Sequence, residues 1–89
     1  MEEIYGIAAF RSRQQVLRFE AALRRAGIPA SVISTPRDVA IGCGLSVRFD
    51  AKYASSVQSV LSAERGDQLI GVYLVRRSGG RSRLTALSR

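Results

Sequence analysis

The residue best suited to chemistry in this 89-residue chain is its only cysteine, Cys43, which lies between Gly42 and Gly44. A sulfur nucleophile must be deprotonated, accessible and able to approach a second sulfur in line. Glycine on both sides removes side-chain bulk, so the backbone of a partner could approach the thiol closely. Successive amides in such a loop could stabilise a thiolate or persulfide anion, and Arg37 could supply a positive charge. These residues predict a side chain that carries a group on sulfur and does not hydrolyse a substrate.

The composition excludes several other kinds of chemistry. The sequence contains no histidine, which removes Ser/His and Cys/His nucleophile pairs and the commonest metal ligand. A single cysteine can form neither an internal disulfide nor a zinc cluster. We therefore expect no metal and no cofactor, and a carrier or accessory protein in preference to a turnover enzyme.

Cys43 could instead be an inert part of the core. Free cysteine is among the most buried residue types. Cys43 also shares odd parity with three apolar residues, so a strand beginning at residue 43 would direct the thiol inward. These three are Leu45, Val47 and Phe49. Gly44 can break that alternation, and spacing alone leaves both interpretations open.

Four segments have the composition or alternation of strands. Residues 3–10 and 30–34 are rich in β-branched or aromatic side chains, and residues 68–76 form a third such run. Residues 45–49 alternate apolar and polar side chains. Apolar groups fall at both parities in 3–10, which predicts that both faces of this strand are covered.

Capping residues place two helices between these strands. Ser12 opens the first, and Gln15 three residues later completes a capping-box pattern. Gly27 ends this helix, and Pro29 prevents its continuation. Asp50 is expected to cap the second helix by accepting from first-turn amides.

The element order β-α-β-β-α-β packs most simply as a ferredoxin-like α+β sandwich, a four-stranded antiparallel sheet with two helices on one face. The alternative is another α+β arrangement in which the long loop adds a short helix. We expect one domain over 1–76, followed by a basic, flexible tail over 77–89. Because the last strand is apolar at both parities and helices cover one face, the other face predicts a homo-oligomer contact.

The net charge of +7 is concentrated at the end of the chain. Residues 76–89 hold five arginines and no acid, which leaves nine basic and seven acidic residues, a net +2, in the rest. Nucleic-acid binding is therefore expected only weakly, through the tail. The acidic start and the lack of a long apolar run predict a cytoplasmic protein without a membrane segment.

Three segments in a fixed order carry a resemblance to a known family. The first helix ends in Leu23–Pro29 (LRRAGIP), the loop begins with Ser34–Arg37 (STPR), and Cys43–Phe49 (CGLSVRF) follows. Over residues 5–75 this order resembles the selenium/sulfur carrier protein-like family. The Pro-Arg pair, a short spacer, Cys-Gly and an alternating strand form the more specific part of the resemblance.

The resemblance implies a thiol that holds sulfur or selenium as a persulfide or selenosulfide for delivery to a maturation enzyme. Cys43 would be the carrier thiol, Pro36 and Arg37 would shape and charge its loop, and Gly44 would allow access. Gly42 completes the expected binding residues. The implied partners are a sulfur or selenium donor protein and an acceptor enzyme. The residues leave open a non-catalytic ligand-binding or regulatory module that acts through self-association.

Overall fold

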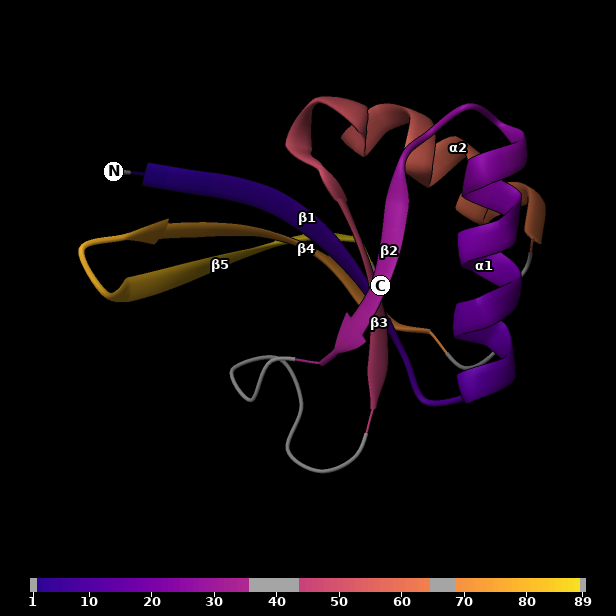
Figure 1. Cartoon of the computed structure of the whole chain (residues 1–89), viewed down its shortest axis with the longest axis horizontal. Coiled ribbons are helices and arrows are strands. Elements are labelled where there is room, and N and C mark those ends of the chain that lie inside the picture. The colour runs from indigo at the N-terminus through magenta and orange to yellow at the C-terminus, as the bar shows by residue number, and fades with distance from the viewer. Residues whose placement is uncertain (1, 36–43, 65–68, 89) are drawn as a thin grey trace.

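The chain folds into one antiparallel sheet and two helices, shown in Figure 1 as a computed structural model that describes residues 2–35, 44–64 and 69–88. The elements in chain order are β1 (Glu2–Phe10), α1 (Arg13–Arg25), β2 (Ala30–Ser34), β3 (Leu45–Asp50), the short 3₁₀ helix η1 (Ala51–Tyr53), α2 (Ala54–Glu64), β4 (Leu69–Ser78) and β5 (Arg81–Ser88). The α+β class expected from the sequence is confirmed.

The sheet has five strands in the order β2-β3-β1-β4-β5, and every neighbouring pair is antiparallel. The expected number of four is therefore wrong. The fifth strand comes from residues 81–88, which the sequence analysis placed beyond the domain. Gly79 and Gly80 join β4 to β5 with φ of +56° and +79°. Positive φ at both central positions is what a two-residue type I′ hairpin requires.

Helix α1 begins and ends where its sequence signals predict. Ser12 has extended backbone angles, and its hydroxyl accepts from the amide of Gln15 at 3.4 Å. Gly27 has a φ of +80°. The amide of Ile28 donates to the carbonyl of Leu23 at 2.9 Å, which completes a Schellman motif with Ile28 buried beside Leu23 in the core.

The second helical segment also starts at its expected cap, with a difference in its first turn. The carboxylate of Asp50 accepts from the amide of Lys52 at 3.1 Å. The residues that follow form the 3₁₀ helix η1, and α2 begins only at Ala54. Val57 is fully buried and anchors α2 to the core. In the described ranges, no helix has the length and apolar character needed to cross a membrane.

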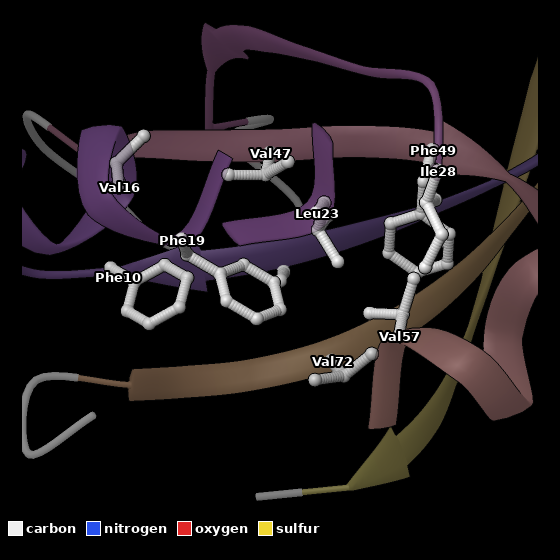
Figure 2. Close-up of a cluster of buried hydrophobic side chains, with 10 residues drawn as sticks. Phe10, Val16, Phe19, Leu23, Ile28, Val47, Phe49, Val57 and Val72 are labelled. Carbon is white, nitrogen blue, oxygen red and sulfur yellow. The ribbon is translucent and has the colours of Figure 1, made fainter. Parts of the chain in front are cut away.

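The main core lies between the helices and one face of the sheet (Figure 2). The rings of Phe10 from β1 and Phe19 from α1 have centroids 5.4 Å apart. The Phe49 ring lies across Gly6 of the neighbouring strand, in the space that any side chain at that position would fill. The buried members are Ala8, Phe10, Val16, Phe19, Leu23, Ile28, Val47, Phe49, Val57 and Val72.

A second, smaller cluster lies on the opposite face of the sheet. Tyr5, Ile7 and Val75 are buried there, and Ile33, Tyr73 and Leu84 are partly buried against them. β1 is accordingly buried from residue 5 to residue 10, which confirms the expectation that both of its faces are covered. Self-association through this face stays a prediction.

Candidate functional site

The loop that carries the cysteine joins β2 to β3. Of the five residues that the sequence singled out, Pro36, Arg37, Gly42 and Cys43 lie outside the described residues, and Gly44 lies within them. The described part of the site is therefore the base from which the loop leaves the sheet.

The base is closed by a backbone hydrogen bond. The register of β2 and β3 ends with Ser34 opposite Leu45. One step further, the amide of Thr35 donates to the carbonyl of Gly44 at 3.0 Å. The two residues that flank segment 36–43 are thus held in contact with each other, and Gly44, the residue directly after Cys43 in the sequence, is anchored by this bond.

Two hydroxyl groups support this base from within the protein. The Oγ1 atom of Thr35 and the Oγ atom of Ser46 are 2.7 Å apart, with either able to donate. Thr35 is 9% exposed and Ser46 is fully buried, so water competes little for this bond. The sequence analysis missed this pair. The available signal was Ser46 itself, a polar residue between two core positions of β3.

Gly44 is packed tightly on its inner side. A Cβ atom there would lie 3.1 Å from Oγ1 of Thr35 and 3.7 Å from the carbonyl oxygen of Phe10. The glycine thus lets the strand end approach Thr35, in addition to the access that the sequence suggested. β3 begins at Leu45, one residue after Gly44. Whether the Cys43 side chain faces the core or the solvent lies outside the described residues.

The base lies at the end of the sheet where α1 also begins. Leu45 is paired with Phe10, the last residue of β1, and α1 starts three residues later at Arg13. Figure 1 shows the start of α1 and the base of the loop at the same, lower end of the molecule. Arg11 and Arg13 are exposed there, and the amides of the first helical turn add a partial positive charge.

This end of the sheet is therefore suited to a negatively charged group. Two arginines without a described carboxylate partner and a helix N-terminus favour an anion at this end. No cluster of three potential metal ligands occurs within the described parts of the chain. The geometry provides a rigid support and a favourable electrostatic setting, and the only thiol of the sequence is next to it.

A model of a known family matches most of the chain. The model of the family described as "Putative Se/S carrier protein-like" matches residues 5–73. The chain belongs to this family. The match covers the Cys43 loop and both of its flanking strands, and it ends within β4, before β5.

Membership of the Se/S carrier family implies interaction with donor and acceptor proteins in general. No curated protein and no solved structure matches the chain. The residues that act in this chain must therefore be argued from its own sequence and geometry.

Proposed function

We propose that this protein carries sulfur or selenium on Cys43, as a persulfide or selenosulfide, and delivers it to a maturation enzyme. The observation that carries the proposal is the family match over residues 5–73, which contains one cysteine and a loop with a closed base. The chain has no second thiol, so any adduct of a thiol must be at this residue.

The proposed chemistry consists of two exchanges at sulfur. In loading, the Cys43 thiolate attacks the outer sulfur or selenium of a donor persulfide or its selenium analogue. A bond forms between Cys43 and that atom, the donor's S–S or S–Se bond breaks, and the donor thiolate leaves. In delivery, a nucleophile of the acceptor attacks the same outer atom, and Cys43 leaves as a thiolate. Neither step needs a cofactor or an external oxidant.

Two features of the described site support this chemistry. The persulfide is an anion near neutral pH, and Arg11, Arg13 and the start of α1 give its end of the sheet a positive potential. The Thr35–Gly44 hydrogen bond fixes the residue next to Cys43. A fixed anchor reduces the conformational freedom that is lost when a donor docks.

The direct test is sulfur transfer followed by intact mass. Reduced protein is treated with polysulfide, and separately with a cysteine desulfurase and cysteine. We expect a gain of one sulfur that a reducing agent removes, and no gain in Cys43→Ser of equal stability. Alkylation across pH should give an apparent thiol pKa below the usual value of about 8.5. A native thiol that accepts no sulfur and is alkylated only after unfolding would refute the proposal.

We further propose the cellular and structural setting of this carrier. Its first four strands and two helices are inferred to be a ferredoxin-like unit, to which β5 is added at one edge. A carrier thiol must stay reduced between transfers, which suits the cytoplasm. Self-association, expected from the sheet face that bears Tyr73 and Val75, is tested by sedimentation across protein concentrations.

A further inference from the structure

The hairpin of β4 and β5 ends in a basic ribbon, which we define as residues 76–83. Four of its side chains are exposed arginines: Arg76, Arg77, Arg81 and Arg83. Residues 69–88 contain no acidic residue at all. Figure 1 shows the tip of this hairpin projecting to one side, away from both helices. The ribbon lies outside the family match at residues 5–73, so its role has to be sought separately from sulfur carriage.

The register places three of these arginines on one face of the sheet. Arg76 lies directly opposite Arg83, and Ser78 lies directly opposite Arg81. Residues opposite each other, and residues two apart on a strand, share a face. Like charges directly opposite each other on adjacent strands are unfavourable. The basic ribbon is thus a place where an external negative charge would be stabilised.

Only part of this charge is compensated within the protein. Arg76 forms an ion pair with Glu2 of β1 at 3.3 Å. No carboxylate in the described ranges lies within ion-pair distance of Arg81 or Arg83. Arg77 has no described carboxylate partner either; it donates to the hydroxyl of Ser82 at 3.5 Å and lies on the opposite face. On the face of Arg76, the uncompensated arginines are those of β5, the outermost strand of the sheet.

An outermost strand offers backbone donors and acceptors to any extended segment of suitable charge. A second copy of β5 would bring its own arginines to this edge, so repulsion disfavours self-pairing. Arginine on an edge strand also discourages pairing with apolar strands. The edge therefore selects for an acidic segment.

We propose that the edge of β5 binds an extended acidic segment of a partner protein by strand addition. Acidic residues at alternate positions of that segment would lie opposite Arg81 and Arg83, where Cβ atoms of adjacent strands are roughly 5 Å apart. A guanidinium and a carboxylate at this spacing can form two parallel hydrogen bonds. The position opposite Leu84 points to the other face, beside Val75, and favours an apolar side chain.

The described surface favours a protein segment over a nucleic acid. Single-stranded nucleic acids are bound by exposed aromatic side chains together with basic ones. The nearest aromatic residue on β4, Tyr73, is partly buried, and its ring lies over Gly71.

The test uses the full chain and a labelled synthetic peptide that alternates glutamate with valine. We expect saturable binding by fluorescence anisotropy, weakened about tenfold or more in Arg81→Ser/Arg83→Ser, as for the loss of two charge-assisted contacts. The matched control is Arg18→Ser/Arg25→Ser, which removes the same charge from exposed positions on α1 that have no described carboxylate partner. It should bind with nearly unchanged affinity.

Two further probes separate strand addition from attraction by charge alone. A peptide of the same sequence with N-methylated backbone amides keeps its charge and loses the strand hydrogen bonds, so it should not bind. Arg81→Glu/Arg83→Glu should prefer a peptide that alternates lysine with valine. The proposal would be overturned if the N-methylated peptide bound as tightly as the unmodified one. It would also be overturned if both double serine variants lost the same affinity for the peptide. The proposal would also be overturned if the protein did not bind the peptide but bound a single-stranded RNA oligonucleotide, and if that binding required Arg81 and Arg83.

Because none of these peptide and RNA probes contains transferable sulfur, the binding results are independent of the proposed sulfur or selenium carriage. A protein that fails to take up sulfur but binds the peptide would retain this inference and lose the proposed function. The reverse result would retain the proposed function alone.

Discussion

The hydroxyls of Thr35 and Ser46 are the buried polar side chains of the described structure, and they satisfy each other. Removing one leaves the other without its hydrogen-bond partner in a largely buried place. We expect Ser46→Ala and Thr35→Val each to lower the free energy of unfolding by about 1–3 kcal/mol. The double variant should lose less free energy of unfolding than the two single variants together, because it leaves no buried hydroxyl without a partner.

Urea unfolding of the four proteins in this cycle measures the coupling between the two hydroxyls. Strictly additive losses would show that the pair contributes nothing beyond its separate side chains. Persulfide lifetime in the same variants adds a second measurement. A loosened loop base should shorten this lifetime, whereas a role in stability alone should leave it unchanged in folded protein.

Gly6 gives a second prediction at the level of single residues. The Phe49 ring occupies the space next to its Cα atom, so Gly6→Ala forces the ring to move within a packed core. We expect a loss of about 1–3 kcal/mol, as for other overpacked core positions. In a Phe49→Leu background, which removes the ring, the same substitution should be less destabilising. An equal loss in both backgrounds, measured by urea unfolding, would contradict this packing.

Residue roles that depend on neighbours in the sequence could be predicted, and those that depend on register could not. Ser12, Gly27 and Asp50 act on backbone groups within a few residues, so their spacing alone identifies them. Thr35 and Ser46 are eleven residues apart and meet only because β2 and β3 pair in one register. Nothing local in the sequence sets that register.

Among the elements, β5 shows why a charged segment can be misread. After the arginines it carries apolar side chains, with Leu84 half-buried beside Val75, and a Gly-Gly pair precedes it, which suits a two-residue hairpin. Its arginines suggested a tail because charged segments rich in glycine often stay disordered. The strand forms because β4, paired with β1 on one side, leaves its other edge open to β5, and because Leu84 and Leu87 contact apolar clusters.

A chain that ends at Ser78 tests the contribution of β5. It removes two partly buried leucines and the cover over Val75, so we expect a loss of about 2 kcal/mol or more in the free energy of unfolding. Binding of a hydrophobic dye should increase as β4 becomes an edge. Arg81→Ser/Arg83→Ser keeps the apolar contacts and is the control, expected to stay within about 0.5 kcal/mol of the parent. An unchanged urea midpoint in the shortened chain would mean that β5 adds no stability.

The whole molecule places its two proposed sites at opposite ends of β1. Phe10, the last residue of this strand, pairs with Leu45 at the base of the Cys43 loop, and Glu2 pairs with Ser78 at the tip of the hairpin. Nine residues of strand span roughly 25–30 Å. β1 is buried from residue 5 to residue 10 and pairs with β4 from Glu2 onward, so it joins the two ends as a rigid element.

Coupling between the sites would need an element with two alternative arrangements that both ligands favour differently. A packed central strand does not provide one. We therefore expect the affinity for the alternating glutamate peptide to change less than about twofold when Cys43 carries sulfur. Likewise, Arg81→Ser/Arg83→Ser should take up sulfur from polysulfide at the parental rate. Peptide titrations of reduced and persulfidated protein measure the first, and timed intact-mass spectra measure the second. A change of fivefold or more in either would mean that the hairpin and the loop respond to each other, and that partner binding regulates transfer.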